Sequence, residues 1–166
     1  MKALRPVALV ALFAVAVAAA WFVVASRRPA VGDTVTVYYT KNDGTTEVPW
    51  RVSLGAARDL PSVAFYVATQ AVAGPPPGVD AVRFPPGTRV LSATVAGSTA
   101  TVDLSSDVDV SAQGGLLETG EFKGLVWTMT SLPGISAVSV HVNGRSVATL
   151  PGGHLELDEP LSRASF

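Results

Sequence analysis

Nineteen consecutive residues, from Val7 to Ala25, carry no charged side chain, and the Trp21 indole is their only hydrogen-bonding side chain. At 1.5 Å per residue, a helix of this length nearly spans the roughly 30 Å hydrocarbon core of a bilayer. Basic residues flank the run on both sides: Lys2 and Arg5 precede it, and Arg27 and Arg28 follow it. The run therefore divides the chain into a membrane-directed segment and a more polar remainder.

Two interpretations of this run differ in whether it is removed. A cleaved signal peptide has an apolar region of about 7–15 residues, followed by small residues at the cleavage site. This run is longer, although Val23-Val24-Ala25 would serve as a cleavage site. Its length favours an uncleaved N-terminal transmembrane helix over 1–28, with a linker over 29–34. The flanking charges slightly favour an internal N-terminus, so the remaining chain is expected outside the cytoplasm. If the run is cleaved, the protein is secreted.

The remainder of the chain is acidic and contains no cysteine. It carries eight basic and thirteen acidic side chains, which gives a net charge of −5. Such a domain lacks the basic patch that nucleic-acid binding requires, so no nucleic-acid partner is expected. The absence of cysteine from the sequence excludes disulfides, thiolate metal sites, a cysteine nucleophile and a lipidated N-terminal cysteine.

Alternating β-branched and aromatic residues predict paired strands, and two apolar stretches between them predict helices. The Asn143-Gly144 pair is the strongest hairpin signal in the sequence. Pro49 cannot donate a backbone hydrogen bond, so its strand is expected at an edge. The predicted order is strands over 33–40 and 46–54, a helix over 61–73, strands over 89–95 and 99–104, a helix over 116–132, and strands over 137–142 and 145–150.

This order predicts an α+β fold in which two helices pack on one face of a small mixed or antiparallel sheet, preceded by the transmembrane helix. The second helix is expected to bury one face, because its apolar residues recur at helical spacing. These residues are Phe122, Leu125, Val126, Met129 and Leu132.

Five short motifs carry a resemblance to a known family. They are Gly74-Pro75, Pro85-Pro86-Gly87-Thr88, Val102-Asp103-Leu104-Ser105, Thr128-Met129-Thr130 and Gly153-His154-Leu155-Glu156, the last with Glu where Asp is usual. In this order and spacing, the sequence over 35–161 resembles the GerMN domain of sporulation, spore-germination and related bacterial envelope proteins, which leaves a tail over 162–166. The resemblance implies an exported or anchored module that acts by interaction and has no established catalytic residues.

The segment around His154 raises the question of a metal or acid–base site. Glu156 and Asp158 alternate beside it, and the only other histidine is His141 on a predicted strand. A zinc site needs three or four converging ligands, and two histidines without cysteine make a closed site improbable. We expect His154 to hydrogen-bond the backbone of the C-terminal segment, after the tight bend that Gly152-Gly153 permits. No metal site is predicted here.

A second acidic cluster resembles the start of a calcium loop, with oxygen-bearing side chains at alternate positions. An EF-hand needs Gly at its sixth position and Glu at its twelfth, where this chain has Val108 and Gly114. The cluster is therefore expected to end a strand and close a turn. An irregular calcium site stays open as the alternative. The cluster consists of Asp103, Ser105, Asp107 and Asp109.

Two weaker signals complete the candidates. Gly114-Gly115 precedes a predicted helix and would present backbone N–H groups to an anion, but no glycine-rich phosphate-binding motif accompanies it. Four aromatic residues would suit a sugar platform, although Trp127 lies within an apolar helix and is expected in the core. They are Tyr38, Tyr39, Trp50 and Trp127.

Two functions therefore stay open. The first is a non-catalytic, membrane-anchored, extracytoplasmic interaction module of the bacterial cell envelope, linked by its resemblance to sporulation or germination. It would contact the membrane through its N-terminal helix and bind envelope proteins or further copies of itself, with the edge of the hairpin over 139–147 as one contact. No catalytic residue and no cofactor is predicted. The alternative is an ectodomain that binds or hydrolyses cell-wall glycan or peptide.

Overall fold

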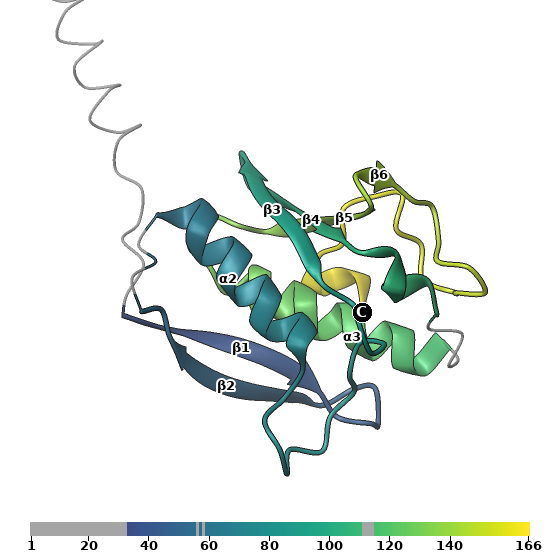
Figure 1. Ribbon diagram of the computed structural model, residues 1–166, viewed down its shortest axis with the longest axis horizontal. Helices are drawn as coiled ribbons and strands as arrows, with labels where there is room; N and C mark the ends of the chain where they lie inside the picture. Colours follow the sequence, from purple (N-terminus) through teal and green to yellow (C-terminus); the bar gives the residue numbers. More distant parts are fainter. Residues whose placement is uncertain (1–32, 56, 58, 111–114) are drawn as a thin grey trace, which may run out of the picture. The chain divides into compact units, whose positions relative to one another are not determined.

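The computed structural model describes residues 33–55, 57, 59–110 and 115–166. The predicted anchor over 1–28 and most of the predicted linker lie outside the described residues. In the part that is described, no helix is both long enough and apolar enough to cross a membrane. The elements are β1 (Thr34–Thr40), β2 (Glu47–Ser53), α2 (Leu60–Ala73), β3 (Val90–Ala96), β4 (Thr99–Leu104), the 3-10 helix η1 (Ser106–Val110), α3 (Gly115–Met129), β5 (Ala137–Val142), β6 (Arg145–Ser146) and the 3-10 helix η2 (Arg163–Ser165) (Figure 1).

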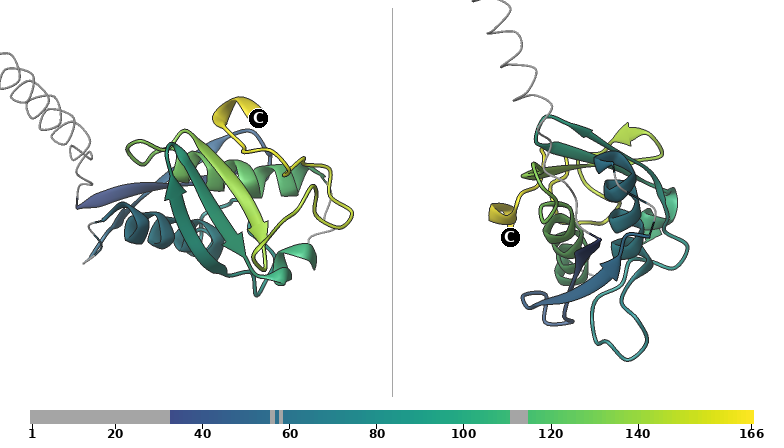
Figure 2. Two further views of the ribbon diagram at one scale, coloured as in Figure 1. Left: turned by 90° about the horizontal axis from the view of Figure 1, so that it is seen from above. Right: turned by 90° about the vertical axis from the view of Figure 1, so that its left-hand side faces the viewer.

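The strands form two sheets, and both helices lie between them (Figures 1 and 2). One sheet is the antiparallel hairpin β1–β2, and the other has the order β3-β4-β5-β6, in which only β4 and β5 run parallel. Helix α2 packs against β1 and β3, and α3 packs against β1 and β5. The α+β class and a mixed sheet are confirmed. The prediction of one sheet with helices on a single face was wrong, because α3 occupies the edge of β1 where a further strand would pair.

Local sequence explains where most elements begin and end. The Asp59 side chain accepts a hydrogen bond from the Ser62 N–H at 3.0 Å and caps α2, and Pro61 follows in the first turn. At the β5–β6 turn, Asn143 and Gly144 both have positive φ, of 48° and 76°, as a two-residue hairpin requires.

Two segments differ from the expectation. The return strand predicted over 145–150 is confined to Arg145–Ser146, because the chain then turns to bury Leu150 and to pair Leu157 N–H with Ala148 O at 2.7 Å. The predicted tail over 162–166 forms η2 behind a Ser162 cap. There Phe166 packs edge-on against Trp127, with ring centroids 5.9 Å apart.

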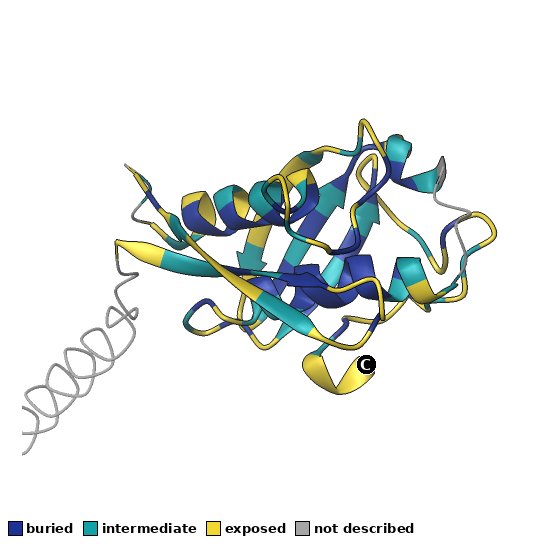
Figure 3. Cartoon of the chain, turned by 90° about the horizontal axis from the view of Figure 1, so that it is seen from below, coloured by how far each residue is buried: buried dark blue, intermediate teal, exposed yellow. Residues whose placement is uncertain are grey.

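Helix α3 is buried on almost every side, whereas β2 is exposed over much of its length (Figure 3). The apolar face predicted to be buried is buried: Phe122, Leu125, Val126, Met129 and Leu132. Burial extends beyond this face, because two sheets and α2 surround the helix. Polar residues of α3 are therefore enclosed as well: Glu118, Glu121, Lys123 and Thr128.

The contact between α3 and β1 is a close approach of two backbones. A Cβ placed on Gly124 would lie 3.0 Å from the Tyr38 carbonyl oxygen. One turn further on, Thr128 Oγ1 accepts the Tyr38 N–H at 2.8 Å and donates to Gly124 O at 2.8 Å. The edge of β1 that faces away from β2 is thus hydrogen-bonded by a helix side chain instead of by a strand.

Replacing Gly124 by Ala should lower the free energy of unfolding by about 1–3 kcal/mol, because the backbone of β1 cannot yield to the added methyl group. This loss should exceed the gain of up to about 1 kcal/mol from the higher helix propensity of Ala. Urea unfolding of the full chain in detergent measures the change.

The matched control is Gly120→Ala in the same helix. Its added Cβ would meet the end of the Val82 side chain at 3.1 Å, and a side chain can shift. A loss for Gly120→Ala as large as that for Gly124→Ala would show that the close approach to β1 is not the constraint.

Candidate functional site

Two carboxylates one helical turn apart, Glu118 and Glu121, are buried in α3. Their exposed fractions are only 2% and 5%. Buried carboxylates normally have a basic partner or several hydrogen bonds, because desolvation of the charged form is costly. The sequence did not single them out, although carboxylates at an i, i+3 spacing beside Gly120 and Gly124 were a usable signal. Small residues four apart on a helix indicate a close approach that encloses their neighbours.

Glu118 holds the segment that contains His154. Its Oε2 accepts the His154 backbone N–H at 2.8 Å. A Cβ on Gly153 would collide with Glu118 Oε1, so the carboxylate occupies the space that a side chain at this glycine would need. The segment is thus tied to α3, but through the backbone of His154 and not through its imidazole. The imidazole is on an exposed residue and packs beside Gly115.

Glu121 is the more perturbed member of the pair. Burial, and secondarily the nearby Glu118 carboxylate, raise the pKa of Glu121 to about 8. At neutral pH its carboxyl group is therefore mainly protonated. It borders a cavity of about 10 Å³ that Thr40, Val82 and Phe84 also line, and that is close to the space one water molecule needs. The cavity has no room for a sugar or peptide substrate.

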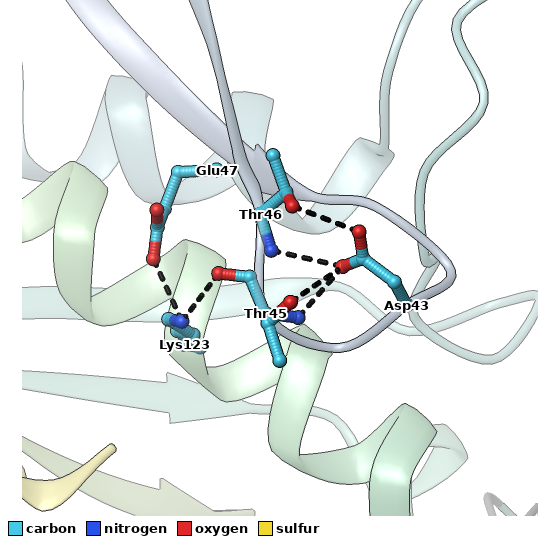
Figure 4. A network of polar contacts seen from close by, with 5 residues as sticks. All are labelled: Asp43, Thr45, Thr46, Glu47 and Lys123. Atoms are coloured by element: carbon cyan, nitrogen blue, oxygen red, sulfur yellow. Dashed lines mark hydrogen bonds and ion pairs between the residues drawn. The ribbon is translucent and has the colours of Figure 1, made fainter.

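A charged network links α3 to the β1–β2 turn (Figure 4). Lys123 Nζ contacts Glu47 Oε1 at 2.7 Å and Thr45 O at 2.8 Å. Desolvation acts to raise the pKa of Glu47, but the hydrogen bond and charge of Lys123 lower it overall. In the same turn, hydrogen bonds from Thr46 and Thr45 hold the pKa of Asp43 well below its usual range. These contacts fix the turn against the helix.

The predicted calcium-like cluster is divided between different partners. Asp103 Oδ1 accepts the Gly144 N–H at 2.8 Å and so closes the β5–β6 turn. Asp107 accepts the Ser105 hydroxyl at 2.8 Å and lies against Gly87, while Ser105 Oγ accepts the Arg89 N–H at 3.0 Å. The segments 87–89 and 105–107 are therefore held together. This agrees with the expectation that the cluster closes turns.

The remaining candidates do not converge. His154, Glu156 and Asp158 are exposed, and His141 lies half-buried on β5. Over 33–55, 57, 59–110 and 115–166, no group of three or more His, Asp or Glu side chains is placed to hold a metal ion. Gly114 lies outside the described residues, so the weak anion-binding signal at Gly114-Gly115 stays untested.

The four aromatic residues lie on three elements. Tyr39 is buried, with its hydroxyl donating to Gln70 O at 3.3 Å, and burial raises its pKa. Trp50 is 42% exposed on β2. Trp127 was expected in the core but is only half-buried at its margin, and the Arg163 guanidinium lies over its ring at 5.6 Å. Arg163 also lies 6.0 Å from the Tyr38 ring, so it joins the C-terminal segment to β1.

An open groove follows the first half of β1. Its volume is about 410 Å³, and most of its lining is polar. One wall is β1 with its neighbour Arg51 from β2, and the other is the chain that leaves α3. Among the described residues that line it, Arg51 is the only charged one. The lining residues are Thr34, Val35, Thr36, Tyr38, Arg51, Ser131, Leu132 and Pro133.

Glu121→Gln should remove a pH dependence of stability. Between its usual value of 4.5 and about 8, the folded state holds one more proton on Glu121 than the unfolded state. The stabilisation is therefore complete below 4.5 and is lost as the pH rises through about 8. In this window, the free energy of unfolding should fall by up to about 1.4 kcal/mol per pH unit. Urea unfolding at several pH values measures the slope.

Glu156→Gln is the control, because Glu156 is exposed. It should leave the slope unchanged. The same slope in Glu121→Gln as in the parent chain would contradict the assignment of the proton to Glu121.

The sequence and the fold were both compared with known proteins. Residues 36–148 match the model of the Germane family, which is described as "Sporulation and spore germination". Among curated proteins, no sequence matches the chain.

Three solved structures share the fold. The tandem GerMN domains of the sporulation protein GerM from Bacillus subtilis match with a TM-score of 0.64 at 22% identity, over 80% of this chain and 47% of that one. The first GerMN domain of the same protein gives 0.61 at 23% identity, over 78% and 98%. A candidate lipoprotein from Clostridium perfringens gives 0.60 at 19% identity, over 81% and 89%.

At these identities the structural matches establish a shared fold. The predicted resemblance to the GerMN domain is confirmed by both comparisons. Because the family model covers more than half of the sequence, the chain belongs to the Germane family of sporulation and spore-germination domains.

Proposed function

We propose that the protein is a non-catalytic, membrane-anchored interaction module that acts outside the cytoplasm, in the cell envelope of a bacterium. Membership of the sporulation and germination family supports the process. The apolar run from Val7 to Ala25 supports the anchor. The fold shared with a candidate lipoprotein is consistent with an envelope location.

The observation that carries this proposal is that the motif residues make structural contacts within the domain. Asp103 binds a turn, Ser105 accepts the Arg89 N–H and donates to Asp107, and the backbone of His154 is tied to α3. These polar motif residues therefore hold elements of the fold together. Open surface features, such as the groove along β1, are left for recognition.

One observation favours a second candidate, a domain that binds cell-wall glycan or peptide. The groove is lined by three aliphatic hydroxyls, the Tyr38 ring and the Arg51 guanidinium. Hydroxyls, an aromatic ring and a cation are the groups that bind sugars and carboxylates. Its polar lining and open form would suit such a ligand.

The interaction proposal is tested by photocrosslinking in cells. A crosslinking amino acid placed at Thr36 in the groove, at Ser92 on β3 or at Phe65 on α2 probes three different elements. We expect at least one position to capture a specific envelope protein, which mass spectrometry identifies in growing or sporulating cells. If no position captures a protein while the isolated protein binds or cleaves glycan, the second candidate replaces the first.

The topology is tested by single-cysteine labelling, which the absence of cysteine from the sequence makes direct. Ser92 is exposed, so Ser92→Cys should react with a membrane-impermeant maleimide in intact, wall-stripped cells. Ala3→Cys is the control and should react only after the membrane is opened. Protection of Ser92→Cys in intact cells would overturn the proposed orientation. The mass of the labelled Ser92→Cys chain shows whether the apolar run is cleaved.

A further inference from the structure

The hydrogen bonding of the outer edge of β1 differs between its two halves. In an antiparallel pair, the backbone groups of alternate residues point away from the partner strand. The Tyr38 N–H points away from β2, because it binds Thr128 Oγ1 at 2.8 Å. Thr40 O likewise accepts the Val82 N–H at 2.8 Å. By the same alternation, the backbone groups of Thr34 and Thr36 also point away from β2.

The groove follows this outer edge at Thr34 and Thr36. Helix α3 ends at Met129, and the chain then turns away through Pro133, which leaves the space beside the first half of β1. Ser131 Oγ lies 3.3 Å from Thr36 O, but its hydroxyl has a shorter hydrogen bond, of 2.7 Å, to Thr128 O. Within the described part of the chain, no residue accepts the Thr36 N–H or donates to Thr34 O. Unpaired backbone groups at a sheet edge can pair with another chain.

Three other strand edges, on β2, β5 and β3, each carry a feature that hinders strand addition. On β2, Pro49 lies opposite Tyr38, so its missing N–H falls at an outward position. On β5, Leu161 exchanges two backbone hydrogen bonds with Val138, at 2.8 and 2.7 Å. The hairpin edge expected as a contact over 139–147 begins just beyond this bridge, and it stays a prediction. On β3, a register shift between Val90 and Ser92 disrupts the pairing.

The groove also has a charge preference. Arg51 is exposed and lies opposite Thr36 on β2, so the two side chains share a face of the hairpin. Within the described chain, no carboxylate pairs with its guanidinium. Arginine binds carboxylates with two parallel hydrogen bonds. A ligand that enters the groove therefore gains most when it places an acidic group at Arg51.

We propose that this groove, for which we use the name β1 groove, binds an extended segment of a partner protein as an added strand against Thr34–Thr36, with an acidic side chain at Arg51. The proposal rests on the proposed function and names the partner's chemistry. The added strand would make few backbone hydrogen bonds, so the affinity would be low in solution. Confinement of both proteins to one membrane raises their effective concentration and makes such a contact sufficient.

The test uses the full chain in lipid nanodiscs and a fluorescein-labelled octapeptide that alternates Val and Thr around one central Glu. A second peptide has Lys in place of Glu, and a third has N-methylated backbone amides. The Glu peptide should bind more tightly than either of the others in fluorescence anisotropy, with empty nanodiscs as the blank. Bound peptide should slow hydrogen exchange at the Thr36 amide by about tenfold or more.

Arg51→Glu should weaken binding of the Glu peptide about tenfold and strengthen binding of the Lys peptide. The matched control is Arg145→Glu, which makes the same charge change at an exposed position on β6 and should leave both affinities unchanged. Thr36→Pro removes the N–H and should abolish binding. If that variant does not fold, the charge exchange at Arg51 and the N-methylated peptide still decide the matter.

Equal binding of the Glu and Lys peptides, or of the N-methylated peptide, would overturn the proposal. Protection of Thr36 by soluble cell-wall glycan fragments but not by peptides would assign the groove to a glycan. Self-association of the chain that Arg51→Glu abolishes would assign it to a second copy. Crosslinking that captures a partner elsewhere while the peptides fail at the groove would refute this inference alone and leave the proposed function standing.

Discussion

Helix α3 lies against the edge of β1 at a backbone separation that leaves no room for a side chain at Gly124. This contact separates β1–β2 from the larger sheet, because α3 takes the place of a third strand beside β1. It also places α3 at the centre of the domain, with a sheet on each side and α2 beside it. The edge of β1 opens where the helix ends, so the same contact sets the position of the groove.

A helix that is surrounded in this way has its polar residues buried along with its apolar ones. Lys123 meets Glu47 and a carbonyl oxygen, and Thr128 replaces a strand partner, so both contribute contacts between elements. Glu118 holds the His154 backbone, but Glu121 has no basic partner within the described chain and is kept neutral by its surroundings. Buried ionisable groups of this kind lower stability in one protonation state.

Much of the fold could be predicted from local patterns, since alternation predicted β5 to the residue, and the Asn143-Gly144 turn lies where expected. The division into two sheets could not, because strand patterns do not show what covers an edge. The surroundings of α3 were missed for a related reason: Glu118 and Glu121 look like solvent-exposed helix residues in sequence. The groove depends on where Met129 ends the helix relative to Thr36, which is a property of packing between segments nearly a hundred residues apart.

Pro49 makes the two outer edges of the β1–β2 hairpin unequal as templates for a further strand. Two copies of an ordinary hairpin can pair edge to edge, and each new copy presents a fresh edge to the next, which is how open-ended cross-β growth proceeds. Here the outer edge of β2 lacks a donor near its middle, so it is a poor template for a further strand. A strand that docks on β1 therefore completes a three-stranded sheet whose far side stops growth. The hairpin can be extended once without seeding a fibre.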